Sequence, residues 1–178
     1  MPITGVFLCA GVIGGICFMR KLIKIAVGLG ACVGIASAAS AGSATANLGI
    51  SANVVATCTI STSPVAFGTY SGAQVDATGT VTANCITGTA WTIGLGAGTG
   101  TGATTSNRKM TSGTDTLSYA LFSDSTRSTN WGNAIGTDTV AGTGTGTSQN
   151  QTVYGRIAAG PTPPPGSYTD TVIATINF

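Results

Sequence analysis

The sequence predicts an all-β protein, a sandwich of short strands, and three observations favour this class. Apolar and polar residues alternate strictly in several segments, and a period of two is typical of strands that bury one face. Residues that form turns, chiefly Gly, Pro, Asn and Ser, separate these segments, as they do in sandwiches. No segment after residue 41 shows the period of an amphipathic helix.

Residues 1–41 have the organisation of an export leader. Residues 19–24 carry Arg and Lys, residues 25–36 are apolar or Gly, and small residues follow, ending in Ala-Ser-Ala before Gly42. Positive charge, a short apolar core and a small-x-small site together make a secretory signal peptide. We expect translation to start at Met19 and cleavage to precede Gly42, so that the mature protein has no membrane segment. The alternative is a two-part membrane anchor over residues 1–41.

An unusually long alternation runs over residues 46–60, where every even position is apolar and only Val55 breaks the polar side. A single strand of this length would span roughly 50 Å, more than the width of a domain of this size. We therefore predict an N-terminal strand extension over residues 42–53, whose apolar face is meant for another molecule, followed by a domain over residues 54–178 whose first strand is 54–60. The side chains on the apolar face of the extension are Ala46, Leu48, Ile50 and Ala52. The alternative is one bent strand that switches between the two sheets of a sandwich.

Cys58 and Cys85 are the two cysteines outside the leader, and both lie on the apolar side of an alternating segment. One pair of cysteines in an exported chain predicts a disulfide, here inside the core. Closing the loop between them should stabilise the fold by roughly 3.5 kcal/mol. A metal site is disfavoured, because two thiols without His make an incomplete zinc site.

The remaining strands are predicted in chain order from the same alternation. The segments are 77–85, 91–95, 117–122, 152–157 and 168–178. Residues 65–70 fit a short strand or a turn, and the proline-rich residues 161–166 fit a loop. The hexapeptide Ala-Gly-Thr-Gly-Thr-Gly occurs at 97–102 and again at 141–146, which fits either a flexible linker or a pair of matching strand segments.

The last strand places apolar side chains on one face. They are Val172, Ala174, Ile176 and Phe178. Neither terminal strand carries Lys, Arg or Glu, the residues that often protect a sheet edge from pairing. The two terminal strands therefore either pair with each other or each seek a partner.

The composition argues against an enzyme and against nucleic-acid binding. The chain has no His and only 7% charged residues, so it offers no His-based nucleophile pair and no basic patch. Asp115 and Asp124 fit turn positions, and no nucleotide or calcium motif is present; we expect no cofactor. Trp91 and Trp131 could stack on a sugar, but they are interpreted more simply as a core residue and a turn anchor.

Several short motifs resemble the spore coat protein U family, whose members include pilins of archaic chaperone–usher systems. The matching segments are 55–60 (VATCTI), 64–68 (PVAFG), 81–85 (VTANC), 131–132 (WG), 153–157 (VYGRI), 165–172 (PGSYTDTV) and Phe178. The resemblance extends over essentially all of residues 42–178. Its most specific parts are the Tyr-Gly pair at 154–155 and the Tyr-x-Asp-Thr-Val motif at 168–172.

This resemblance implies an immunoglobulin-like sandwich that lacks its last strand. The missing strand leaves an apolar groove. A periplasmic chaperone first fills this groove with a strand of its own, and an outer-membrane usher is the next partner. In the fibre, the N-terminal extension of the next subunit fills the groove instead. The apolar face at 46–52 would be the donor strand, and Val172, Ala174, Ile176 and Phe178 would line the acceptor groove. The implied function is a structural subunit of a surface pilus or fimbria that serves adhesion and biofilm formation, exported through the periplasm to the cell surface. The alternatives are a non-polymerising coat or surface protein whose own N-terminal strand folds back, and a sugar-binding module.

Overall fold

The computed structural model of the chain describes residues 40–178. The leader predicted over residues 1–41 therefore lies almost entirely outside the described residues. Residues 40–57 carry no strand and are exposed. Within residues 40–178, no helix is long and apolar enough to cross a membrane.

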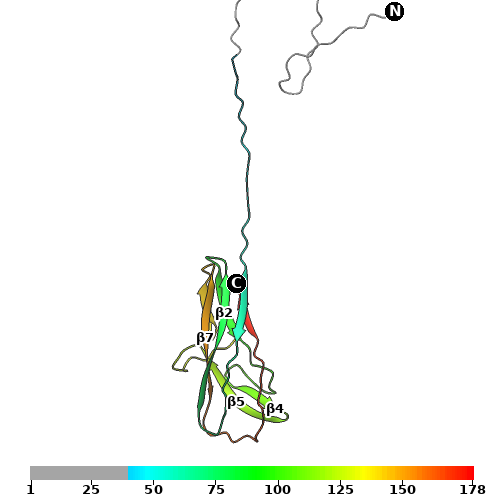
Figure 1. Cartoon of the computed structure of the whole chain (residues 1–178), viewed down its shortest axis with the longest axis vertical. Helices are drawn as coiled ribbons and strands as arrows, with labels where there is room; N and C mark the ends of the chain where they lie inside the picture. The colour runs from blue at the N-terminus through cyan, green and yellow to red at the C-terminus, as the bar shows by residue number, and fades with distance from the viewer. Residues whose placement is uncertain (1–39) are drawn as a thin grey trace, which may run out of the picture. The chain divides into compact units, whose positions relative to one another are not determined.

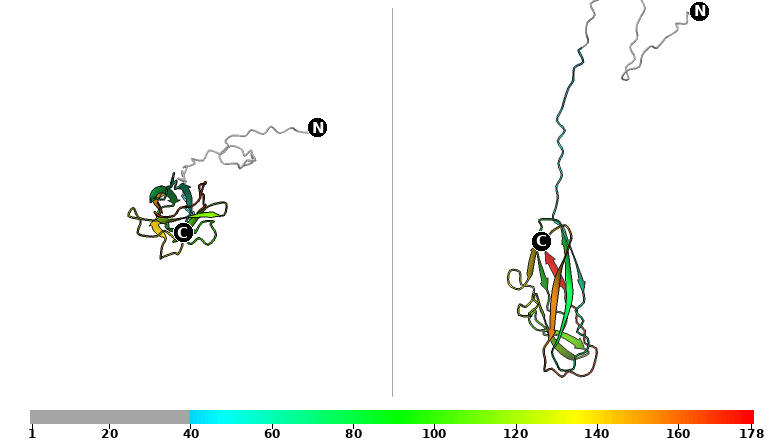
Figure 2. Two further views of the ribbon diagram at one scale, coloured as in Figure 1. Left: turned by 90° about the horizontal axis from the view of Figure 1, so that it is seen from below. Right: turned by 60° about the vertical axis from the view of Figure 1, so that its left-hand side comes forward.

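The described chain forms strands only, as the alternation predicts, and they build two antiparallel sheets (Figures 1 and 2). The strands are β1 (Cys58–Ser63), β2 (Val75–Cys85), β3 (Ala90–Leu95), β4 (Arg108–Ser112), β5 (Asp115–Phe122), β6 (Val140–Thr143), β7 (Ser148–Ile157) and β8 (Ala174–Asn177). One sheet has the order β1-β2-β7-β5-β4, and the other has the order β6-β3-β8. Each ladder between neighbouring strands is antiparallel.

The core lies between the two sheets and is made by the apolar sides of the predicted strands. Its buried apolar members are Val81, Ala83, Cys85, Trp91, Ile93, Leu95, Leu117, Tyr119, Leu121, Trp131, Val153 and Ile157. In β2, β5 and β7 buried and more exposed residues alternate, which confirms the strands predicted from the period of two. β4 and β6 were not predicted, because their short sequences, RKMTS and VAGT, carry no clear alternation.

Two predicted strands are shorter than expected. The strand predicted over 54–60 begins only at Cys58 and continues to Ser63, because its partner β2 ends at Cys85, directly opposite Cys58. The strand predicted over 168–178 is regular only in β8; before it, Thr169 forms an isolated bridge with Thr111. The bent strand over 46–60 is not observed.

The repeated hexapeptide has two different structures. Residues 97–102 form a loop that is held in place, since the backbone N–H and hydroxyl of Thr99 donate to the Asp170 carboxylate. Residues 141–146 begin inside β6, where a Cβ on Gly142 would meet the ring of Trp91. The flexible-linker and matching-strand interpretations are therefore both wrong. Identical sequences differ here because their neighbours in space differ.

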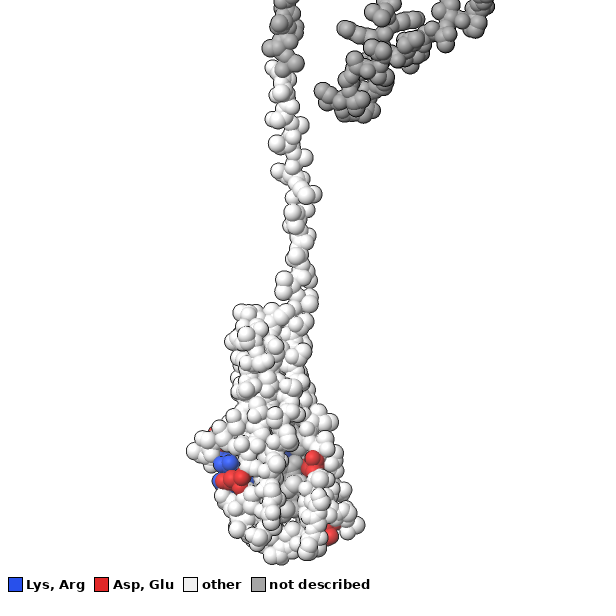
Figure 3. Space-filling model, viewed as in Figure 1, with Lys and Arg blue, Asp and Glu red and all other residues white. Residues whose placement is uncertain are grey.

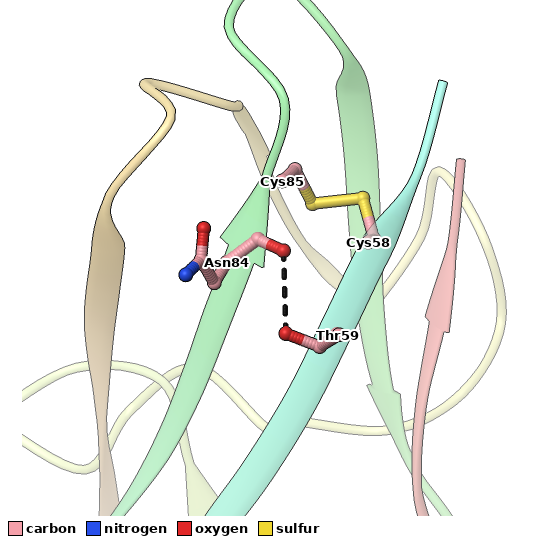
Figure 4. The surroundings of a disulfide bond; sticks show 4 residues. All are labelled: Cys58, Thr59, Asn84 and Cys85. Carbon is pink, nitrogen blue, oxygen red and sulfur yellow. Dashed lines mark hydrogen bonds between the residues drawn. A yellow bond between two sulfur atoms is a disulfide. The ribbon is translucent and has the colours of Figure 1, made fainter. Parts of the chain in front are cut away.

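The predicted disulfide is present between Cys58 and Cys85 (Figure 4). The two residues lie directly opposite each other in the β1–β2 ladder, and Cys85 is buried in the core. One position further along, the hydroxyl of Thr59 donates to the carbonyl of Asn84 at 3.5 Å. The bond therefore ties the first residue of β1 to the last residue of β2.

Two glycines allow the loop after β1 to pack closely on the sheet. A Cβ on Gly155 of β7 would lie 2.8 Å from atoms of both Val65 and Phe67, and one on Gly79 of β2 would lie 2.7 Å from Val65. Gly155 belongs to the Tyr-Gly pair noted in the sequence. Its missing side chain is what lets Val65 and Phe67 reach the core.

Replacing Gly155 with Ala should therefore destabilise the fold by about 1–3 kcal/mol, the usual cost of overpacking. Thermal melting of protein that comprises residues 42–178 measures the effect. Gly49→Ala is the matched control, because no atom lies within 4 Å of its Cβ position. A Gly155→Ala protein as stable as the Gly49→Ala protein would show that the close packing is not required.

Candidate functional site

The two sheets of the sandwich stay open along one side, between β1 and β8. β1 is the edge strand of the five-stranded sheet and β8 is an edge strand of the three-stranded sheet. The two strands lie close together (Figure 4), but in the part of the chain that the structure describes no ladder joins them. Edge strands present unpaired backbone N–H and C=O groups, which can template pairing with another chain.

A groove of about 320 Å³ opens at this side, and we call it the edge groove. Residues from both sheets and from the loop after β1 line it. They include Val65, Phe67, Val81, Leu95, Met110, Leu121, Val153, Tyr168, Val172 and Ala174. Val81, Leu95, Leu121 and Val153 belong to the buried core, so the floor of the groove is the core itself.

The predicted acceptor residues occupy the inner face of the last strand, with one exception. Val172, Ala174 and Ile176 are half-buried and pack against the core, and the first two line the edge groove. Ile173, between them, is 72% exposed, as the alternation requires. Phe178 lies beyond β8 and is 60% exposed, and neither it nor Ile176 lines the edge groove.

The predicted donor residues are all exposed in the described chain. Ala46 and Ala52 are exposed, and the larger side chains of Leu48 and Ile50 are 86% and 88% exposed. Adjacent large apolar side chains that stand in water along one face are typical of interaction sites. The segment is therefore free to pair with a partner.

A hydrogen-bonded carboxylate lies in the lining of the edge groove, and no sequence pattern beyond the Tyr-x-Asp-Thr-Val motif pointed to it. Asp170 lines the groove. The Tyr119 hydroxyl donates to one carboxylate oxygen of Asp170 at 2.7 Å. The backbone N–H and hydroxyl of Thr99 donate to the other at 2.7 and 2.8 Å. These bonds tie β5, the loop after β3 and the segment before β8 together.

The hydrogen bonds outweigh burial in setting the charge of Asp170. Burial by itself raises the pKa of this carboxyl, but the bonds from Thr99 and Tyr119 hold its pKa below the ordinary value. Burial, together with the nearby Asp170 carboxylate, raises the pKa of Tyr119. The tyrosine therefore stays protonated and remains a hydrogen-bond donor at neutral pH.

This network predicts an acid-sensitive contribution to stability. Because the folded pKa of Asp170 lies below its unfolded value of about 3.9, the contribution is complete above that value. It is lost as the pH falls through the folded pKa. Asp170→Asn should destabilise the protein at neutral pH, and the difference from wild type should shrink between about pH 5 and about pH 3. Melting temperatures of both proteins across this range provide the test. A difference that stays constant would show that ionised Asp170 contributes nothing.

Arg108 of β4 is the most unexpected buried residue, at 0% exposed. Its guanidinium donates to the carbonyls of Leu95 and Trp131 at 2.9 and 2.7 Å. It also donates to those of Gly96 and Thr105 at 2.8 and 2.6 Å. Burial lowers the pKa of Arg108, but an arginine remains charged at neutral pH. The residue holds together three chain segments, at residues 95–96, 105 and 131.

Both tryptophans are core residues. Trp91 is 3% exposed and Trp131 is 0% exposed, and the indole N–H of Trp131 donates to the carbonyl of Ile93 at 2.9 Å. The core interpretation of Trp91 is confirmed, and Trp131 is more deeply buried than a turn anchor. The interpretation that either ring stacks on a sugar is wrong, because neither ring is accessible at the surface.

The charged side chains gather at one end of the sandwich. In the view of Figure 3 they lie over the half that contains β4 and β5, and the other half shows none. Asp76 pairs there with Arg156 at 2.7 Å. Asp124 accepts hydrogen bonds from Ser128 and Thr129 within its own turn, as expected for a turn residue. Among the residues from 40 onwards, no three His, Cys, Asp or Glu side chains form a group that could hold a metal.

Comparisons with known proteins agree with this architecture. The Spore Coat Protein U domain matches residues 44–175. Protein U of Myxococcus xanthus is 36% identical over 160 residues, which cover 80% of this chain and 89% of that protein. A chain in the crystal structure of the CsuC–CsuE chaperone–tip adhesion subunit pre-assembly complex, from the archaic chaperone–usher Csu pili of Acinetobacter baumannii, matches with a TM-score of 0.54 and 22% identity.

The structural match covers 70% of this chain but only 40% of the matched chain, and at this identity it bears on the fold alone. The domain match is more extensive, since residues 44–175 include almost the whole described chain. The chain is thus a member of the spore coat protein U family.

Proposed function

We propose that this chain is a structural subunit of a cell-surface pilus, assembled by donor-strand complementation on the chaperone–usher pathway. One observation carries the proposal: a groove open to the core between β1 and β8 occurs in the same chain as an exposed alternating segment at 46–52. The groove has room for an added strand, and the segment has the alternation of a strand but no pairing partner in the described chain. The family match begins at residue 44, so it includes this segment.

The edge groove and the segment at 46–52 have the features that strand addition requires. An added strand pairs with the free backbone of a sheet edge for affinity, and its alternate side chains fill pockets for specificity. Burying Leu48 and Ile50 would contribute about 1.5–3 kcal/mol each. Each ladder bond would add about 0.5–1.5 kcal/mol. The donor strand therefore contributes on the order of 10 kcal/mol, which is comparable to the stability of a whole domain.

The same groove explains which partners the subunit needs. A chain whose core is open to water requires a cover before assembly, and a periplasmic chaperone would supply it. The matched solved structure is named as a chaperone–subunit complex. An outer-membrane usher would then exchange the chaperone for the donor strand of another copy. The subunit would pass through the periplasm to the surface, where the fibre would serve adhesion and biofilm formation.

The function is structural and not enzymatic in this proposal. The chain has no His or Glu, and the carboxylates and arginines described above hold chain segments together. A second candidate is a non-polymerising coat protein, which the description of the matching domain as Spore Coat Protein U favours. In that case the segment at 46–52 would fold back into the edge groove of its own chain.

Purified protein that begins at Gly42 separates these functions. Produced with its chaperone and usher, it should form long fibres in negative stain and large species in size-exclusion chromatography. Protein that lacks residues 42–53 should remain bound to the chaperone and form no fibres. If the complete mature chain is instead a stable monomer without a chaperone, the fold-back candidate is correct and the pilus proposal fails.

A further inference from the structure

Two adjacent valines precede β1, and the donor strand leaves them without an assigned partner. Val54 and Val55 are 80% and 62% exposed. Neighbouring residues of a strand face opposite sides, so the two cannot both continue the apolar face of the donor. The sandwich domain of the same chain begins almost directly after the valines, since the carbonyl of Thr57 accepts a hydrogen bond from the N–H of Ile86 at 3.1 Å.

A second cavity, of about 790 Å³, lies between residues 65–72 and 161–168, and we call it the proline cavity. Its apolar lining includes Phe67, Tyr70, Met110, Leu117, Ile157, Pro161, Pro163, Pro164, Pro165 and Tyr168. None of the residues that line it is Asp, Glu, Lys or Arg, so its chemistry suits an uncharged, apolar segment. The two cavities adjoin each other, because four residues line both. These are Val65, Phe67, Met110 and Tyr168.

An antiparallel register brings the valines to the place where the two cavities meet. Residues 46–52 and 172–178 are equally long and alternate alike, and the sheets of this fold are antiparallel. Aligned in that way, the facing pairs are Ala52–Val172, Ile50–Ala174, Leu48–Ile176 and Ala46–Phe178. The next pairs are then Val54–Asp170 and Val55–Thr169. Both acceptor residues line the edge groove beside Tyr168, which lines both cavities.

A parallel register would have the opposite effect. It would carry the valines past Phe178, beyond the end of β8 and away from the proline cavity. Only the antiparallel register brings both exposed valines beside Tyr168, which lines the edge groove and the proline cavity. The valines can therefore reach the proline cavity only if the donor strand is antiparallel to the last strand.

We infer that the proline cavity is the docking site for Val54 and Val55 of a second copy of this chain. The inference rests on the proposed function, since the donor strand of that copy fills the edge groove. Only Ala56 separates the valines from Thr57, which is bonded to its own body. Anchoring the valines therefore leaves little free chain between successive subunits, and the joint in the fibre is stiff.

Cysteine cross-linking in assembled fibres tests the register and the docking site. Val55→Cys with Thr169→Cys places two thiols at a facing pair; both native residues are exposed. Ser51→Cys with Ile173→Cys does the same within the donor strand, and Asn47→Cys with Thr169→Cys is the mismatched control. After mild oxidation, gels without reductant should show a ladder of covalent oligomers for the first two pairs and none for the third.

The outcomes distinguish this inference from the proposed function, because each sample is also imaged. Fibres that cross-link through 51 and 173 but not through 55 and 169 would leave the pilus subunit intact and overturn the docking site. Fibres that cross-link through neither pair, or through the mismatched control, would overturn the register and the docking site with it. If no fibres form in the wild-type protein, the proposed function fails and the inference falls with it.

Removing the apolar side chains measures what the docking contributes. The double variant Val54→Ser, Val55→Ser should still form fibres, but these should dissociate roughly tenfold faster in denaturant. Asn47→Ser, on the outer side of the donor strand, is the matched control and should dissociate like wild type. Equal dissociation of the valine variant and the control would show that the cavity does not hold the valines.

Discussion

Replacing Leu48 or Ile50 with Asp should abolish fibre formation while the chaperone-bound subunit stays folded. Both side chains are more than four-fifths exposed, so a carboxylate at either position costs the single chain little. In the edge groove of a neighbouring copy, the same carboxylate would lie unpaired among apolar side chains. An unpaired buried charge costs several kcal/mol or forces a raised pKa. Thermal melts of the chaperone-bound subunit and images of polymers from the same variants measure the two effects.

Two controls define the result. Val81→Asp, at a 2% exposed position of β2, should abolish folding itself. Ser51→Asp, on the outer side of the donor strand, should leave fibres intact. If Leu48→Asp lowers the stability of the subunit as much as Val81→Asp does, the segment is an internal strand and the polymer proposal is wrong.

The second large effect is expected at Arg108. Arg108→Met keeps most of the side-chain volume but removes donors to four backbone carbonyls. Buried acceptors that lose their partners cost about 1–3 kcal/mol each before relaxation. Breaking a buried charged network typically costs about 3–5 kcal/mol in total. We therefore expect the protein to lose about 3–5 kcal/mol of stability, measured by thermal or denaturant unfolding of the chaperone-bound subunit.

The neighbouring residue provides the matched control for this variant. Lys109 is only partly buried and makes one long hydrogen bond, to the carbonyl of Thr101 at 3.4 Å. Lys109→Met should change stability by no more than about 0.5 kcal/mol. Similar losses for both variants would mean that general charge, and not the buried bonds of Arg108, stabilises this end of the sandwich.

Strands with one buried face could be predicted because their signal is local. In β2, β3, β5 and β7 the residues that alternate in the sequence are those that enter the core. The disulfide was predictable for a similar reason, since two cysteines on apolar faces leave one pairing. β4 and β6 were missed because their strand state comes from the ladders of their neighbours and not from their own composition.

The candidate site also has features that are visible in the sequence and contacts that only the structure shows. The alternating apolar faces at 46–52 and 172–178 are visible in the sequence, while their roles as donor and acceptor are proposals. Phe178 lies outside β8, and the strand expected at 54–60 starts at Cys58. The bracing contacts were not readable. Asp170 looks like an ordinary loop carboxylate until Tyr119 and Thr99 meet it, and Arg108 looks like a surface charge until carbonyls from three segments converge on it.

By itself, then, the sequence determined the strand class, the disulfide and the presence of an unmatched apolar segment, because burial on one face imposes a period of two wherever it occurs. The tertiary structure decided which strands became edges. β1 and β8 lie at the open side because β1 pairs only with β2 and β8 pairs only with β3 in the described chain. Strand order depends on pairing between residues far apart in the sequence, and no local pattern encodes it. The edge groove, the proline cavity beside it and the convergence of backbone carbonyls on Arg108 all follow from that order.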